Sequence, residues 1–225
     1  MTKKTFLDEL MFHYPELNVC RTTILRAYEL LVNVNKTGCK ILVCGNGGSS
    51  SDADHFTAEL MKSFRAKRPL SMLVKERLAK LGEQGIHLSN HLEQAIPVIS
   101  LSAHTATMTA VSNDIGYEFA FAQQVVGYGN EGDVLIAITT SGKSINITNA
   151  IYTAKALGMK VICFTGNTEG FKGDHFCDVI IRVPSVETYR IQEYHLPIYH
   201  SLCAMIEDKI VKESEIEKPR KKTRN

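Results

Sequence analysis

The sequence has 225 residues, of which 44% are hydrophobic and 22% charged, and its formal net charge is +2. This length suffices for one full hydrophobic core. Much of the positive excess lies in the last eight residues, KPRKKTRN, so the near-neutral remainder predicts no nucleic-acid-binding surface.

The six cysteines form no C-x-x-C pair, which favours reduced thiols in a cytoplasmic protein over disulfides or a zinc finger. No apolar segment follows the lysines at the start of the chain, and we therefore expect no signal peptide. No uninterrupted apolar run reaches roughly 18 residues, which predicts no contact with the membrane interior.

Short apolar runs alternate with helical patterns along the chain. Two helical patterns come first, at 5–12 and 20–35. Five runs typical of buried strands follow, at 40–44, 97–101, 134–140, 160–166 and 178–183. Helical patterns lie between them, at 50–63, 105–112, 116–126 and 144–157. This order predicts an α/β fold, a three-layer sandwich with a five-stranded parallel sheet covered by helices on both faces.

Residues 64–96 are longer than an ordinary connection between a helix and a strand. Leu73, Leu78 and Leu81 indicate a short helix, and 83–89 are expected to form a loop. An active-site lid, a subunit contact and a surface insertion are all open interpretations of this segment. We predict a single domain over 1–213 that contains this insertion, followed by a charged, disordered tail at 214–225.

A glycine-rich turn, GNGGSSSDADHF at 45–56, follows the first strand directly. A dinucleotide fingerprint would need a third glycine where Ser50 stands. The segment AITTSGKS at 137–144 would be a nucleotide-binding P-loop only if Ala137 were glycine. Neither segment therefore predicts a nucleotide cofactor.

Both segments end a predicted parallel strand and lead into a helix. The free amide groups and the dipole at a helix N-terminus favour an anion there. Hydroxyl groups add further donors at Ser49, Ser50, Ser51, Thr139, Thr140, Ser141 and Ser144. Because the two strands end at the same edge of the sheet, we expect one monophosphate site between the two loops.

Five stretches in unbroken order together resemble the sugar isomerase (SIS) domain, and more closely the sedoheptulose 7-phosphate isomerase (phosphoheptose isomerase) family. They are 45–60, 111–125, 129–151, 158–167 and 190–200. The resemblance implies a homotetramer with shared active sites that isomerises sedoheptulose 7-phosphate to D-glycero-D-manno-heptose 7-phosphate. This product is a precursor of heptose for lipopolysaccharide or capsule. The 64–96 segment exceeds the family's usual connector, and Thr139 stands where the family has serine.

The resemblance also implies which residues form the site. Those matching substrate contacts, with Ser49 beside them, are Asn46, Gly47, Gly48, Glu59, Asn113, Asp114, Thr139, Thr140, Ser141, Ser144 and Gln192. Some family members bind zinc, and a set of four nitrogen and oxygen ligands predicts one zinc ion per subunit here. These ligands are His55, Glu59, Gln192 and His200.

Isomerisation of a ketose to an aldose moves a proton between adjacent carbons through an enediol, and needs a base and an acid. Glu59 is the predicted base; it follows His55 by four residues and shares its helix face. His200 is the predicted acid, because imidazole titrates near neutral pH. Gln192 and His200 would lie roughly 12 Å apart along a straight helix. Both could reach one ion if the segment bends, if Gln192 precedes the helix, or if a neighbouring subunit contributes. Pro197 lies between them and is the candidate position for a break.

Two other functions compete with this prediction. A non-catalytic SIS protein could bind a sugar phosphate, or associate with a replication initiator, without turnover. Retention of the four polar ligands favours the enzyme over such a binding module. An isomerase for another ketose phosphate is a second alternative, because the 64–96 segment could reshape the sugar end of the site.

Overall fold

The computed structural model describes residues 5–216, apart from the side chains of residues 35 and 214–216. Its centre is a five-stranded sheet in the order β2 (Val98–Ser100), β1 (Ile41–Gly45), β3 (Val134–Ile138), β4 (Lys160–Gly166) and β5 (Val179–Val183). Every neighbouring pair is parallel. The predicted fold class and all five predicted strands are confirmed.

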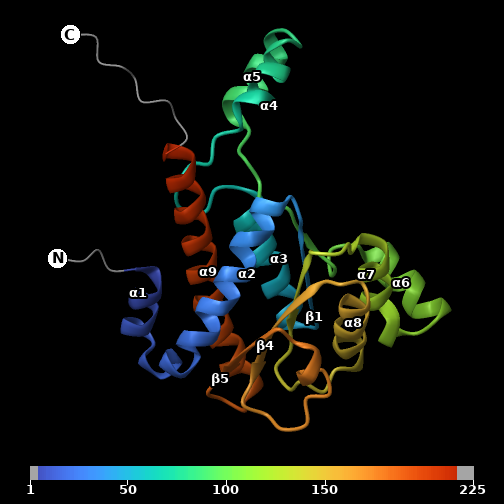
Figure 1. Cartoon of the computed structure of the whole chain (residues 1–225). Helices are drawn as coiled ribbons and strands as arrows, with labels where there is room; N and C mark the ends of the chain where they lie inside the picture. Colours follow the sequence, from blue (N-terminus) through green and yellow to red (C-terminus); the bar gives the residue numbers. More distant parts are fainter. Residues whose placement is uncertain (1–4, 217–225) are drawn as a thin grey trace.

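Helices cover both faces of the sheet (Figure 1). One face packs against α2 (Arg21–Thr37), α3 (Gly48–Met61) and α9 (Thr188–Ile216), and α1 (Phe6–His13) packs on α9. The other face packs against α7 (Ala120–Tyr128) and α8 (Ile145–Ala156), and α6 (Thr105–Asp114) packs on α7. The short 3₁₀ helices are η1 (Pro15–Cys20), η2 (Tyr117–Phe119) and η3 (Asp174–Phe176).

Alternation along the buried strands supplies both cores. In β1, Ile41 and Val43 join the core on the α3 and α9 side, whereas Leu42 and Cys44 join the core on the α8 side. Successive strand side chains point to opposite faces, so a strand covered on both sides must be apolar throughout. This is why the strands could be identified from short continuous apolar runs.

The 64–96 insertion forms a helical arm, which consists of α4 (Met72–Ala79) and α5 (Glu83–His91) and projects from the body (Figure 1). The predicted loop at 83–89 is wrong, because these residues belong to α5. Glycine usually weakens a helix, but Gly85 allows close packing here, since a Cβ at this position would collide with the carbonyl of Leu78.

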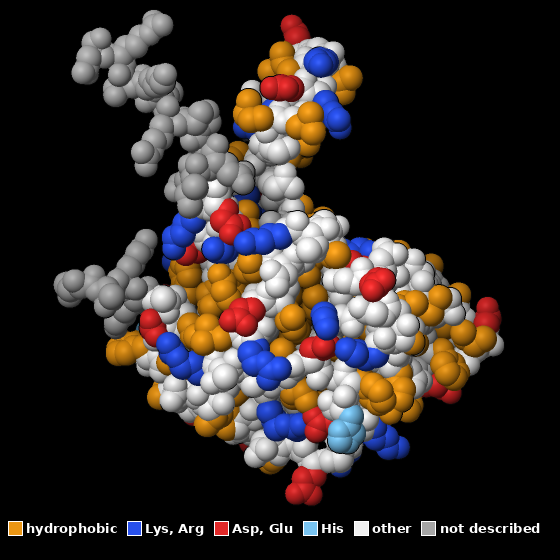
Figure 2. Space-filling view, in the orientation of Figure 1, with side chains coloured by type: hydrophobic (Ala, Val, Ile, Leu, Met, Phe, Trp, Pro, Cys, Tyr) orange, Lys and Arg blue, Asp and Glu red, His pale blue; other side chains and the backbone are white. Residues whose placement is uncertain are grey.

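The arm lies beyond the C-terminal end of α3, whereas the glycine-rich turn precedes its N-terminal end (Figure 1). The arm is therefore not placed to act as a lid over the glycine-rich turn of its own chain. No residue of α4 is buried, and hydrophobic side chains are exposed on the arm (Figure 2), among them Met72, Leu73 and Leu81.

A buried carboxylate fastens the base of the arm to α9. Glu207 accepts hydrogen bonds from the main-chain N–H groups of Phe64, Arg65 and Ala66, at 2.8, 2.7 and 2.8 Å. Nε of Arg68 lies 3.3 Å from Oε1 of Glu207, and both side chains are almost fully buried. This contact fixes the segment through which the chain leaves α3.

Helix α9 continues for 29 residues through Pro197, so the predicted break there is wrong. Proline removes the hydrogen bond to the carbonyl four residues earlier. That carbonyl belongs to Glu193, which is exposed, so water can hydrate it. The predicted disordered tail begins inside α9, and its residues 217–225 lie outside the described part. Among residues 5–216, no helix is long and apolar enough to cross a membrane.

Candidate active site

A pocket of about 270 Å³ lies where β1 and β3 end side by side. Gly45 is paired with Ile138 in the sheet, which brings the glycine-rich turn next to the threonine loop. The lining residues are Asn46, Gly47, Gly48, Ser49, Ile138, Thr139, Thr140, Ser144, Thr188 and Gln192. The structure thus brings together most of the predicted substrate-binding residues.

The glycines of the turn have distinct steric roles. Gly47 has φ +54° and immediately precedes α3. This left-handed backbone favours glycine because it has no Cβ. A Cβ on Gly48 would lie 2.5 Å from Nε2 of Gln192. Gln192 of α9 therefore packs directly on the turn, which explains why it lines the pocket.

Asn46 is held by its own chain. Its amide exchanges two hydrogen bonds with the amide of Asn146, each 2.9 Å long. The hydroxyl of Tyr117 donates to Oδ1 of Asn46 at 2.6 Å. Asn146 is buried and also accepts from the N–H of Ile147. Sequence reasoning did not assign Asn146 or Tyr117 to the site, because neither lies in the turn itself.

The threonine loop divides its hydroxyl groups between structure and the pocket. The Thr139 hydroxyl accepts from the N–H of Gly142 at 3.2 Å, which tightens the loop. Ser144 precedes α8 and makes no side-chain cap to the helix. Ser141 does not line the pocket, and its predicted substrate contact stays a prediction. Thr188, which sequence reasoning missed, completes the lining from the start of α9.

Three predicted ligands form a second cluster, between α3 and α9. Nε2 of His55 lies 3.1 Å from Oε1 of Glu59 and 3.5 Å from Nε2 of His200. One ligand atom from each side chain lies within 4.8 Å of the others. The four-residue spacing on α3 places His55 and Glu59 on one face, as predicted.

The donor set fits a zinc ion. Two imidazole nitrogens and one carboxylate oxygen converge, and a carboxylate with imidazoles is typical of catalytic zinc sites. Burial lowers the pKa of His200, and nearby His55 lowers it further, which favours the neutral imidazole that binds metals. The facing Nε2 atoms of the two histidines would both direct lone pairs at a cation between them.

A tyrosine lies behind this cluster. The hydroxyl of Tyr199 is 2.9 Å from Nδ1 of His55 and 3.4 Å from Oδ1 of Asp52. Burial, and after it the Asp52 charge, raises the pKa of the Tyr199 phenol, so it stays protonated at neutral pH. Burial likewise raises the pKa of Asp52.

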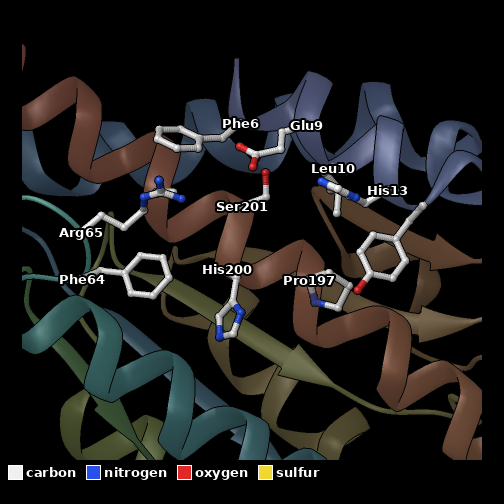
Figure 3. Close-up of a pocket in the computed structure, with 11 residues that line it drawn as sticks. Phe6, Glu9, Leu10, His13, Phe64, Arg65, Pro197, His200 and Ser201 are labelled. Carbon is white, nitrogen blue, oxygen red and sulfur yellow. The ribbon is translucent and has the colours of Figure 1, made fainter. Parts of the chain in front are cut away.

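A cavity of about 240 Å³ lies between α1, residues 64–65 and α9 and shares His200 with the cluster. Figure 3 shows the His200 imidazole pointing away from α1, with Phe64 beside it. The ring centroids of Phe64 and His200 are 5.5 Å apart. Phe64, at the base of the arm, therefore packs against His200, which is one of the proposed metal ligands.

Three predicted residues are not gathered with the cluster. Gln192 lies eight residues before His200 on the uninterrupted α9, about 12 Å along its axis, and its role as a metal ligand stays a prediction. Asn113 and Asp114 end α6, where their side chains bond to each other at 2.8 Å and are exposed. Neither lines the pocket of its own chain.

Comparison with known proteins finds an SIS-domain match and relatives named phosphoheptose isomerase. A family model described as the SIS domain matches residues 72–166. The chain is 40% identical to the phosphoheptose isomerase of Campylobacter jejuni over 193 residues, which cover 86% of this chain and 90% of that protein. It is 37% identical to the phosphoheptose isomerase of Aliarcobacter butzleri over 212 residues, 92% of this chain and 98% of that one.

Solved structures of two phosphoheptose isomerases superpose on most of this chain. A phosphoheptose isomerase from Francisella tularensis superposes with a TM-score of 0.69 at 34% identity and covers 91% of this chain and all of its own. Phosphoheptose isomerase GmhA from Neisseria gonorrhoeae gives a TM-score of 0.66 at 30% identity, with the same coverage of both chains.

Proposed function

Because the chain belongs to the phosphoheptose isomerase family of SIS-domain proteins, we propose that it isomerises sedoheptulose 7-phosphate to D-glycero-D-manno-heptose 7-phosphate. The observation that carries this proposal is a carboxylate beside two imidazoles, together with a separate pocket at the ends of β1 and β3. A non-catalytic SIS protein would need only the pocket. The cluster and the isomerase relatives therefore do not favour that alternative.

The phosphate group binds in the pocket between the two loops. Main-chain N–H groups at the start of α8, with the hydroxyls of Thr140 and Ser144, supply donors for it. Gln192 lines this pocket, and His200 lies about 12 Å further along α9. An extended seven-carbon sugar phosphate suits this span, and anchoring the phosphate would position the reacting carbons.

Glu59 acts as the base. It removes a proton from C1 of the ketose, and the electron pair moves to give the enediol. The same carboxyl group returns a proton to C2, which yields the aldose. In the metal-free site, where Nε2 of His200 holds no cation, His200 exchanges protons with the oxygens on C1 and C2. The Glu59 side chain is 17% exposed, so the proton that it carries can exchange with solvent before it reaches C2.

One zinc ion per subunit is part of the proposal. His55, Glu59 and His200 would hold it, with Gln192 as the fourth predicted ligand, and zinc would polarise the substrate carbonyl. Glu59 would then serve both as a ligand and as the base. No nucleotide is needed for this chemistry.

A homotetramer with shared active sites is also proposed. Asn113 and Asp114 match the family's substrate contacts but lie exposed at the end of α6, away from the pocket of their own chain. A neighbouring subunit would bring them to a substrate. The proposed setting is the cytoplasm, with heptose made for lipopolysaccharide or capsule.

A substrate panel with product detection by NMR tests the proposal. Sedoheptulose 7-phosphate should give aldose signals, other ketose phosphates should give far less, and a strong chelator should reduce the rate. Asp54 on the same helix offers a matched control: Asp54→Asn should keep activity, whereas Glu59→Gln should lose it. A folded wild type that yields no aldose would refute the isomerase.

A further inference from the structure

The Tyr199 hydroxyl connects the side chains of Asp52 and His55 on α3, and the proposed chemistry gives this connection no role. Asp52 and His55 lie almost one turn apart on α3, and Tyr199 precedes His200 on α9. The Tyr199 hydroxyl lies within hydrogen-bonding distance of both, at 2.9 Å from Nδ1 of His55 and 3.4 Å from Oδ1 of Asp52. The three groups form a chain that ends at the nitrogen opposite the cluster.

The direction of this chain follows from the proton inventory. A protonated phenol has one proton to donate. When Asp52 is ionised it can only accept, so Tyr199 then donates to Asp52 and accepts from Nδ1–H of His55. Nε2 of His55 then carries a lone pair toward Glu59 and His200. Without a cation, Glu59 favours the opposite tautomer of His55, because its carboxylate can accept a hydrogen bond from Nε2–H. A cation bound at Nε2 takes the place of that proton and leaves the Nδ1–H tautomer.

We propose that Asp52 and Tyr199 act as a positioning relay for His55, which fixes its Nδ1–H tautomer and aims Nε2 at a divalent cation held with Glu59 and His200. Metal-bound histidines commonly donate their second N–H to an acceptor, and such partners orient the ring. Here the acceptor is a tyrosine hydroxyl, with a carboxylate behind it. This inference rests on the proposed metal site.

Burial limits the other contacts that the Tyr199 hydroxyl can make. Tyr199 is 1% exposed, and its ring packs edge-on against both histidines, with centroids 5.5 Å from His55 and 5.0 Å from His200. Oδ2 of Asp52 is also buried and has no hydrogen-bond partner within residues 5–216. An aromatic ring alone would satisfy the packing, so the hydroxyl is what distinguishes a relay from a core residue.

Zinc affinity tests the relay directly. The full chain is stripped of metal and titrated with zinc against a chromophoric chelator, as wild type, Tyr199→Phe and Tyr194→Phe. Tyr199→Phe keeps the ring and removes the acceptor, and should weaken zinc binding roughly 10- to 100-fold. Tyr194→Phe removes a hydroxyl from the same helix outside the cluster and should match wild type.

A second readout follows the proton itself. In the zinc-loaded wild type, Nδ1–H of His55 should give a downfield NMR signal protected from solvent exchange, and Tyr199→Phe should lose that protection. A zinc Kd for Tyr199→Phe within twofold of wild type would overturn the relay, as would a wild type that binds no zinc. Isomerase activity of the wild type, measured separately, decides the proposed function independently of either result.

Discussion

Replacing Glu207 with glutamine should destabilise the fold and disturb the site. Glu207→Gln keeps the shape of the side chain but removes the charge that faces buried Arg68 at 3.3 Å. Its amide also places donors against three main-chain N–H groups that now point at a carboxylate. Removing one partner of a buried ion pair costs about 3–5 kcal/mol, mostly because the other charge stays buried.

Urea unfolding at a fixed protein concentration measures this loss. With a slope of about 3 kcal/mol/M, a loss of 3 kcal/mol moves the midpoint down by about 1 M. Asp208→Asn, on the next residue of α9, removes an exposed carboxylate that pairs with Lys212 and should cost about 0–1 kcal/mol. The double variant Glu207→Gln/Arg68→Met should recover part of the loss, because no buried charge is left unpaired.

The reasoning would be refuted if Glu207→Gln unfolded at the wild-type urea concentration. It would also fail if the double variant were less stable than the sum of both single changes. A loss in Glu207→Gln that the double variant recovers would show that the buried charge dominates. Because Glu207 orders Phe64, which packs on His200, the single variant should also raise KM.

Three further predictions concern the turn, the core and the pocket. Gly45→Ala should prevent normal folding because its Cβ would collide with the main chain of Ser49, whereas Gly127→Ala meets nothing within 4 Å and should leave the thermal midpoint unchanged. Burial lowers the pKa of His195 to about 4. Between about pH 6.5 and 4, His195 is therefore protonated in the unfolded chain but stays neutral in the folded chain. The free energy of unfolding should therefore fall by up to about 3 kcal/mol between pH 6.5 and 4, and urea titrations of His195→Leu should lack this part. Ser144→Ala should raise KM about tenfold or more in steady-state kinetics through a lost phosphate contact, and an unchanged KM would remove Ser144 from the phosphate site.

The sheet and the meeting of the two loops at one pocket could be predicted because both depend on local signals. Strands buried on both faces need apolar runs, and two loops that end adjacent parallel strands must meet at one edge. The pairing of Gly45 with Ile138 shows this meeting. The spacing of His55 and Glu59 fixes their common helix face without any tertiary information.

The remaining site residues depend on packing between distant segments. Asn146 and Tyr117 reach Asn46 only through the arrangement of α8 and η2, and no periodicity reports such contacts. Tyr199 looks like one more apolar position of α9 until α3 is placed against it. The course of α9 through Pro197 and the helix around Gly85 were mispredicted for a similar reason, because tertiary context overrode local propensity.

The most direct test of the central claim is the fate of the carbon-bound proton. Sedoheptulose 7-phosphate is incubated with zinc-loaded protein in deuterated buffer, and the aldose is analysed by NMR. The account predicts that wild type forms D-glycero-D-manno-heptose 7-phosphate with deuterium at C2, through an enediol whose proton exchanges on Glu59, and that folded Glu59→Gln forms none. Aldose formed at the wild-type rate by Glu59→Gln would contradict the account.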